Sequence, residues 1–466
     1  MLNIEVWAVP GLFIFLFLGF WFLMRGAYFS LFALLVISFG MNAFTALAGT
    51  LWFPYKVVMI PIILFTIFRL NWSSASPMIS PYYGLLILSV GVAWVTGPAM
   101  PGATFLQGPV MRPLVQLYTY AGMALMIPFI LFVISNQFQL EKSLRFYFRL
   151  SEIIIAIGLL HLIFLILGLE FIPILRPGGE HSQMAAFGYE DTVINRIYGI
   201  SGEPKTLATF ILPYIFISTY NFLERNYNIN KAYHLSFIAI STIVMIYTFS
   251  SALLMSAAIA LPVISYFFRH RIQKSVLNFA FLIGFVVIVF GQVGAAFLGT
   301  PEKENYFEET QKEYSWSDIL YERSFGRVEE EAEERFEMVA LNYISKEQPG
   351  YLVTGFGLGM YNYHLPLPRH GRGVEPIDSG WVVILMDLGI LGLLFFLFLL
   401  NNISKLRNFN KHYNNIYLNS YLIGAIVAFL AHIGNNALYQ IFLFLGLALA
   451  AYNIMLRELN TGTNEQ

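Results

Sequence analysis

Residues 355–392 read GFGLGMYNYHLPLPRHGRGVEPIDSGWVVILMDLGILG and join a polar loop to an apolar helix. The stretch opens with three glycines at alternate positions and passes through a segment rich in His and Arg. After Asp378 it becomes apolar for about 20 residues, the length that an α-helix needs to span a bilayer. The sequence therefore predicts that a large loop brings charged groups to the mouth of a membrane-spanning helix.

The composition of the whole chain is that of a membrane protein. Only 12% of its 466 residues are charged and 57% are hydrophobic, whereas roughly a quarter of the residues in a soluble domain are charged. Apolar runs of about 20 residues fill most of the chain, which predicts an all-α polytopic membrane protein. The chain has no cysteine, and this excludes disulfides, thiolate metal sites and cysteine nucleophiles.

The hydropathy pattern predicts about 13 spans. The first follows MLNIE, which lacks the basic segment and the cleavage site of a signal peptide, so we expect this helix to be retained. The third run is short enough to be either a tilted span or a re-entrant segment. The predicted spans are 7–24, 28–49, 54–68, 82–98, 114–134, 151–169, 205–222, 233–249, 251–268, 276–298, 380–400, 416–433 and 436–456.

Lys and Arg in the short loops orient the chain. Four basic links fall on one side of the bilayer when these spans are threaded through it; they lie at 142–149, 225–231, 269–274 and 405–411. Basic loops stay preferentially in the cytoplasm, so we expect the N-terminus outside and the C-terminus inside. One missed helix would scatter these links over both faces, and their agreement therefore supports the number of spans.

Two long segments then lie outside, at 170–204 and 299–379. They divide the chain into N-terminal spans (1–169), a first outer loop, central spans (205–298), a large outer loop and C-terminal spans with a cytoplasmic tail (380–466). The large loop carries 16 acidic against 8 basic side chains. Loops longer than roughly 12–15 residues are usually functional or disordered, so we expect this one to have a function.

The large loop contains a helical pattern. Apolar residues recur there at helical spacing, which predicts an amphipathic helix at about 326–346. Its acidic run at 329–334 is typical of a solvated helix face. Ser315 and Asp318 mark the start of a shorter helix. The apolar positions are Val328, Ala332, Phe336, Ala340 and Ile344.

The segment from Arg196 to Thr206 favours an anion site. Pro204 suits the first position of the helix that follows, and the topology points the N-terminus of this helix outward. A helix N-terminus has free N–H groups and a partial positive charge. Arg196 and Lys205 beside it would cradle a phosphate or diphosphate. In the alternative reading they lie among lipid headgroups or pair with nearby acids, namely Glu190, Asp191 and Glu203.

Further charged residues lie in the large loop. Arg335 has Glu331 one turn earlier on the predicted helix, and an ordinary surface pair explains it as well as a ligand does. His364, Arg369, His370 and Arg372 are dense enough to suit an anionic ligand, or they form a solvated basic loop. Because no strand precedes Gly355–Gly359 and no crossover helix follows, we read this segment as an irregular turn and not as a dinucleotide site.

Two aspartates lie where the large outer loop meets the helix that follows it. Asp378 is either the N-cap of the helix after it or a general base at the membrane face. Asp387 lies inside that helix, where an ionisable group is functional or structurally paired. Three other polar residues fall within spans, and we expect them to be packed and hydrogen-bonded inside the bundle: His161, Gln292 and His432.

In this order, over roughly residues 190–455, the pieces resemble bacterial O-antigen ligases and Wzy-type surface-polysaccharide polymerases. Arg196-x-x-Gly199, ending in Glu203-Pro204, is similar to the arginine-glycine motif of the family. Polymerases often have Glu-Pro there, whereas ligases often have Asn-Pro. The segment from Arg335 through Pro349 to Gly355-x-Gly357-x-Gly359 is similar to the helix and glycine stretch of the family.

The third piece of the resemblance is Asp378-Ser-Gly-Trp to Asp387-Leu-Gly389-Ile-Leu-Gly392, which is similar to the start of the helix after the large loop of the family. Asp378 stands where ligases carry a histidine. Ser250-Ser251 lack the arginine of the Ser-Arg pair that is common in the family. Both departures favour a polymerase over a ligase.

The resemblance implies a GT-C-like glycosyltransferase of the bacterial plasma (inner) membrane, with its active site facing the exterior or periplasm. The donor would be a glycan on a polyprenyl diphosphate. The acceptor would be another lipid-linked repeat in a polymerase, or lipid A-core in a ligase. We expect no metal, no other cofactor and no nucleic acid, and the partners would be the lipid bilayer, a flippase and a chain-length regulator.

The resemblance also implies roles for individual residues. Arg196, Arg335 and Arg372 would hold the diphosphate and stabilise its charge as it leaves, and Asp378 would accept the proton of the attacking hydroxyl. The large loop would position the sugars. Further residues expected to bind substrate are Lys205, Glu203, His364, Arg369, His370, Tyr361, Tyr363 and Trp381.

Two rival functions remain open. A transporter or flippase explains the many helices, but it predicts broken spans in matching halves of the chain, and the sequence does not show them. A non-catalytic scaffold leaves the His- and Arg-rich loop without a purpose.

Overall fold

A computed structural model of the protein describes most of the spans and the second half of the large loop. The described residues are 8–41, 46–47, 50–51, 53–69, 76–97, 108–167, 169, 171, 186–189, 192–224, 231–248, 250–268, 336–365, 369–370, 373–374, 377 and 379–462. Arg335, Arg372, Asp378, Gln292, the span predicted at 276–298 and the short helix after Ser315 lie outside them.

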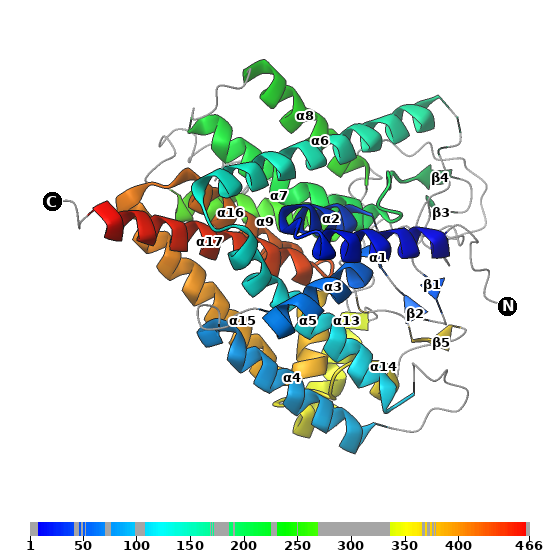
Figure 1. Cartoon of the computed structure of the whole chain (residues 1–466). Helices are drawn as coiled ribbons and strands as arrows, with labels where there is room; N and C mark the ends of the chain where they lie inside the picture. The colour runs from blue at the N-terminus through cyan, green and yellow to red at the C-terminus, as the bar shows by residue number, and fades with distance from the viewer. Residues whose placement is uncertain are drawn as a thin grey trace.

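Helices dominate the described part of the chain and coincide with the predicted spans (Figure 1). Six of them are long and apolar enough to cross a membrane, which supports a membrane-embedded helical protein. The helices are α1 Ala8–Met24, α2 Tyr28–Gly40, α3 Pro54–Arg69, α4 Ser76–Thr96, α5 Met111–Val133, α6 Gln137–Ile166, α7 Pro204–Leu223, α8 Lys231–Tyr247, α9 Ser251–Phe267, α15 Gly380–Tyr413, α16 Ile416–Ala431 and α17 Leu438–Gly462.

The C-terminal pair of helices forms the centre of the bundle. α16 packs against α17, α7 and α9, and α17 also packs against α5. Figure 1 shows α6 and α8 along one side of this centre, with α4 and α15 along the opposite side. Large side chains such as Tyr214, Tyr421 and Phe444 are fully buried there. The last spans of the chain therefore hold earlier ones in place.

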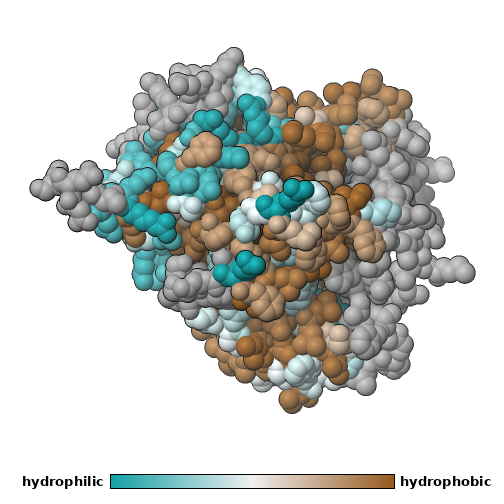
Figure 2. All heavy atoms as spheres, viewed as in Figure 1, coloured by the Kyte–Doolittle hydropathy of each residue, from teal (hydrophilic) through white to brown (hydrophobic). Residues whose placement is uncertain are grey.

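Two basic links that we predicted as loops are helical. α6 begins at Gln137 and not at 151, because Asn136 caps it by accepting a hydrogen bond from the amide of Gln139 at 2.9 Å. Glu141 and Arg145 then pair across one turn. α15 likewise continues through 405–411. These helices extend beyond the apolar region, and Figure 2 shows hydrophilic residues gathered at the end of the bundle where α17 ends.

Three short hairpins accompany the helices in the described part of the chain, and the all-α class stands. They pair β1 (Ala46–Leu47) with β2 (Thr50–Leu51), β3 (Ala186–Tyr189) with β4 (Thr192–Asn195), and β5 (Arg369–His370) with β6 (Gly373–Val374), all antiparallel. The second and third hairpins lie in the two long segments predicted to be outside, whereas β1 lies in the last residues of the span predicted at 28–49. Two residues separate the strands in every case, which is the commonest length of a hairpin connection.

The amphipathic helix of the large loop is confirmed at its C-terminal end. α13 (Phe336–Asn342) leads into a π-helical turn at Tyr343–Glu347. Ala340 and Ile344 on its apolar face are completely buried. They pack in a second hydrophobic core, separate from that of the main bundle, which also contains Phe356 and Met386. The loop therefore packs against the bundle.

The glycines at 355, 357 and 359 dock this loop onto three helices. All three have positive φ, which glycine adopts at little cost. A Cβ on Gly355 would lie 2.6 Å from the Asp387 carbonyl carbon in α15, and one on Gly357 would lie 2.4 Å from Ala93 N in α4. One on Gly359 would lie 2.7 Å from the Gln116 side chain in α5. Only glycine allows such close approach, so the alternate glycines are a packing motif.

The same loop fills a break in α15. Gly389 has φ 66° and ψ −164°, which interrupts the helix. The amide of Phe356 donates to Met386 O at 2.7 Å, and the amide of Ile390 donates to Leu352 O at 2.9 Å. The backbone groups freed by the break thus find partners in the loop, as they must at membrane depth. The sequence did not predict this break.

Substitution of Gly357 by Ala should destabilise the docked loop. The new methyl group would overlap the backbone of Ala93 at a positive φ, and overpacking plus backbone strain together cost about 2–4 kcal/mol. We expect a lower midpoint of thermal unfolding in detergent for Gly357→Ala. Gly350→Ala is the matched control, because nothing lies within 4 Å of its added Cβ. Equal midpoints for both variants would contradict the docking role.

Candidate functional site

Asp387 belongs to α15 and binds the loop that is docked through Gly355, Gly357 and Gly359. It is 1% exposed, and its carboxylate accepts hydrogen bonds from the Gly359 amide at 2.9 Å and from the Tyr120 hydroxyl at 3.2 Å. Its carbonyl accepts from Ser89 Oγ at 2.7 Å. A buried carboxylate needs such partners. Asp387 therefore joins the loop to α4 and α5, which agrees with a structural pairing.

Arg112, which our sequence reasoning did not single out, clamps the far side of this loop. Its Nε donates to Gly359 O at 2.6 Å and its Nη1 donates to the Tyr363 hydroxyl at 3.0 Å. Its guanidinium carbon also lies 4.8 Å from the centroid of the Tyr363 ring. Tyr363 is thus engaged by a protein cation.

The rings of Tyr361 and His364, next to Tyr363, pack against the protein. They belong to α14 (Tyr361–His364). Tyr361 is 9% exposed. His364 stacks on Phe356 with ring centroids 4.7 Å apart, and burial lowers the pKa of its imidazole, which favours the neutral form. This placement favours a packing role for both over contact with an anionic glycan.

The arginine-glycine segment folds around His161. The Nδ1 of His161 accepts hydrogen bonds from the amides of Tyr198 at 3.3 Å and Gly199 at 3.2 Å. Gly199 has φ +53°, and a Cβ there would lie 3.7 Å from Gly158 in α6. As predicted, His161 is packed and hydrogen-bonded. Its role is to hold the Arg196–Gly199 turn against α6.

Arg196 points into the bundle. It is 7% exposed, and its Nε donates to Thr248 O at 2.9 Å, just beyond the end of α8. The amide of Ile197 donates to Tyr247 O at 3.3 Å. These two bonds tie the segment to the link between α8 and α9. Arg196 therefore lies at a meeting of helices and not among lipid headgroups.

The start of α7 agrees with the sequence reading. Pro204 occupies the first helical turn and Glu203 is the N-cap residue. The Glu203 carboxylate accepts a hydrogen bond from Thr206 Oγ1 at 3.2 Å. Lys205 is half-buried beside it. The predicted cradle residues Arg196 and Lys205, and Glu203 with them, thus lie at one end of the bundle.

The turn between α16 and α17, residues 432–437, organises this end; we call it the hub turn. Asn435 Nδ2 donates to Thr209 Oγ1 at 2.8 Å, and the Thr209 carbonyl accepts from Gln440 Nε2 at 2.9 Å. Thr209 Oγ1 itself donates to Lys205 O at 2.7 Å. The hub turn and the start of α17 thus hold the first turns of α7.

The hub turn also contacts the starts of α9 and α15. A Cβ on Gly434 would lie 2.4 Å from the Cβ of Ala252, in the first turn of α9. The amide of Gly380, the first residue of α15, donates to His432 O at 2.9 Å. Beside it, the Trp381 indole donates to Phe429 O at 3.2 Å. The N-termini of α7, α9 and α15 therefore gather around one turn.

This convergence favours negative charge. Each helix N-terminus contributes free N–H groups and a partial positive charge. Arg196 and Lys205 add positive charge near α7, and the Glu203 carboxylate at its N-cap offsets part of it. The predicted topology places these N-termini at the outer end of the bundle. Asp378 precedes the first described residue of this group, Ser379, by one position. Among the described residues, no group of three His, Asp or Glu side chains is placed to hold a metal ion.

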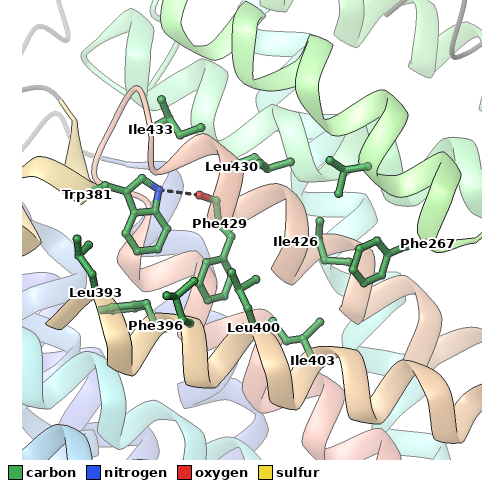
Figure 3. Close-up of a pocket in the computed structure, with 12 residues that line it drawn as sticks. Phe267, Trp381, Leu393, Phe396, Leu400, Ile403, Ile426, Phe429, Leu430 and Ile433 are labelled. Carbon is green, nitrogen blue, oxygen red and sulfur yellow. Dashed lines mark hydrogen bonds between the residues drawn. The ribbon is translucent and has the colours of Figure 1, made fainter. Parts of the chain in front are cut away.

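An apolar groove begins beside the hub turn (Figure 3). It has a volume of about 510 Å³ and runs between α9 and α15 over α16. Trp381 and Ile433 line the end near the hub turn, and Phe267 and Ile403 line the far end. Figure 3 shows these side chains facing a common space. Such a groove suits a long apolar chain whose polar head lies at the hub turn.

The other predicted site residues are placed less fully. The backbones of Arg369 and His370 form β5, and their side chains are outside the described part. The predictions for Arg335, Arg372 and Asp378 also lie outside it. Sequence reasoning missed the hub turn, although Gly434-Asn435-Asn436 between two apolar runs was a visible turn signal.

Comparison with known proteins gives no match. A scan against protein-family models, a search of curated proteins and a search of solved structures each found nothing similar to this chain. The case for a function is therefore made from the residues and the geometry of the hub turn.

The Thr209 hydroxyl is predicted to hold the hub turn on α7. Thr209→Val keeps the shape of the side chain but leaves Asn435 Nδ2 without its partner, which costs about 1–3 kcal/mol. We expect the free energy of unfolding in detergent to fall by that amount. Thr219→Val is the control, since Thr219 also bonds one turn back, to Ile215 O at 2.7 Å. A fall of equal size in the control would argue against the link.

Proposed function

We propose that the protein is a membrane glycosyltransferase that elongates a surface polysaccharide. It transfers a glycan from a polyprenyl diphosphate to the hydroxyl of another lipid-linked repeat, at the outer face of the bacterial plasma membrane. The observation that carries this proposal is the gathering of three helix N-termini around the hub turn, at one end of an apolar groove. Arg196 is held nearby in sequence, at the link between α8 and α9. A diphosphate on a long isoprenoid chain matches that combination.

In the proposed reaction the helix N-termini, Arg196, Arg335 and Arg372 bind the diphosphate. The acceptor oxygen attacks the anomeric carbon, and the bond from that carbon to the diphosphate oxygen breaks. The acceptor proton passes to the Asp378 carboxylate, and the polyprenyl diphosphate leaves with the electron pair. A single displacement inverts the anomeric centre. Cations and backbone amides lower the barrier most when they contact the group on which negative charge develops in the transition state. In this reaction that group is the leaving diphosphate.

The apolar groove and the large loop each have a role in this scheme. The groove would hold the isoprenoid chain at membrane depth, and the large loop, docked through its glycines, would lie over the reacting ends. A flippase and a chain-length regulator are the partners that such a reaction would use.

Two alternatives remain in view. A ligase would use the same donor and pass the glycan to lipid A-core or another acceptor. A transporter of lipid-linked oligosaccharide is favoured by the break at Gly389, because interrupted spans are common in transporters. The loop backbone fills that break, however, which favours a fixed structure.

Loss of Asp378 or Arg196 should slow glycan transfer strongly. We expect the rates of purified Asp378→Asn and Arg196→Ala with a defined lipid-linked repeat to fall at least about 100-fold, the usual contribution of a general base. Glu347→Gln and Arg145→Ala are controls, since both side chains are exposed.

The same assay on the unmodified protein separates the three candidate functions. A ladder of glycan lengths indicates a polymerase, and a single transfer to lipid A-core indicates a ligase. Unconsumed donor supports transport, and near-normal rates in both variants would refute the roles.

Filling the groove should weaken binding of a long donor. Ile426→Trp adds bulk at a lining position, so we expect the KM for a full-length polyprenyl donor to rise about tenfold, which is about 1.4 kcal/mol. The KM for a donor with a short chain should change little. Leu394→Trp is the matched control, because Leu394 is 53% exposed and does not line the groove. Equal KM changes in the two variants would exclude the groove as the chain site.

A further inference from the structure

His432 is the first residue of the hub turn, and only one of its ring nitrogens has a hydrogen-bond partner among the described residues. The side chain is 1% exposed. Its Nδ1 accepts a hydrogen bond from the Ala437 amide at 3.0 Å, so that nitrogen carries no proton. The imidazole is then neutral, with its hydrogen on Nε2. His432 therefore presents a fixed N–H donor.

That donor has no hydrogen-bond partner in the described part of the chain. The backbone carbonyls of Gly380 and Asn435 interact with the ring, but neither lies in the position of a well-formed hydrogen bond to Nε2. Buried donors in native proteins are nearly always paired, and an unpaired one calls for an explanation. Ser250 Oγ, which precedes α9, is also buried and has no partner among the described residues. Two polar atoms without a partner in the described part of the chain thus lie at or near the hub turn.

The ring of His432 lies where α15 begins. A Cβ on Gly380 would be 2.1 Å from His432 Cε1, so the imidazole packs directly on the backbone two residues after Asp378. The ring also meets Trp381 edge to face, with centroids 4.7 Å apart, and Trp381 lines the groove. The ring of His432 is therefore packed on the start of α15 and lies beside Trp381, one of the residues that line the groove.

We propose that His432 is a substrate-binding residue whose Nε2–H donates a hydrogen bond to a phosphate oxygen of the polyprenyl diphosphate. This inference rests on the proposed function, because it names a contact within that site. As a neutral donor, His432 transfers no proton in the reaction. It fixes the diphosphate against the start of α15, while Arg196 and the helix N-termini supply the positive charge.

Two near-isosteric variants separate the roles of the two ring nitrogens. His432→Asn places an oxygen near the position of Nδ1, so it keeps an acceptor for the Ala437 amide and loses the distal donor. His432→Gln places an amide N–H near the position of Nε2, so it keeps the distal donor and loses the acceptor. A purely structural histidine is rescued by Asn, whereas a substrate-binding one is rescued by Gln.

The readout is binding of polyprenyl diphosphate to the full-length protein in nanodiscs, together with thermal stability. We expect Asn to weaken binding about tenfold to hundredfold, as loss of a hydrogen bond to a charged group does, at near-normal stability. Gln should bind within about threefold of the unmodified protein while unfolding at a lower temperature. Inorganic diphosphate and nanodiscs with or without anionic phosphatidylglycerol separate the isoprenoid donor from a free anion and from a lipid headgroup.

Equal or tighter binding by the Asn variant would overturn the inference and leave Nε2 bonded to water. Preference for phosphatidylglycerol over polyprenyl diphosphate would overturn it as well. The proposed function fails separately, if the unmodified protein binds polyprenyl diphosphate but transfers no glycan. Failure of the unmodified protein to bind polyprenyl diphosphate refutes both.

Discussion

The structure depends on one backbone exchange, between the break in α15 and the loop that precedes this helix. Interrupting a helix at membrane depth frees N–H and C=O groups that lipid cannot satisfy. Residues 352–356 supply the missing partners, and the Asp387 carboxylate bonds the Gly359 amide. The large loop and the span after it consequently form one unit. The three glycines follow from this, because only a chain without side chains can come so close to α4, α5 and α15.

This exchange bears on the proposed chemistry because it holds α15, the helix whose first turn lies at the hub turn. The first turn of α15 lies against His432, while α7 and α9 reach the same hub turn through Thr209 and Ala252. Three helices distant in sequence thus direct their positive ends to one place. In a preorganised anion site the fold orients the dipoles before the ligand binds, and this arrangement resembles such a site. The groove between α9 and α15 extends from that place into the apolar region.

Local features were predictable where the physics is local. Apolar runs located the described spans, and Pro204 located the start of α7. The buried face of the amphipathic helix was read correctly at Ala340 and Ile344. The ends of α6 and α15 were not, because charged residues that favour helix continue both helices beyond the apolar region. The hairpins were also missed, since strands of two to four residues are too short to leave a pattern.

The sequence by itself determined the class of this protein: a chain of apolar helices with one large polar loop, since burial in lipid requires only composition and length. It also pointed to the Arg196–Lys205 segment and the alternate glycines. Only the tertiary structure decided what those residues meet. Arg112 reaches Gly359 across 247 positions, and His432 meets Gly380 across a helical hairpin. Such partnerships depend on how helices pack, and no periodicity along the chain records them.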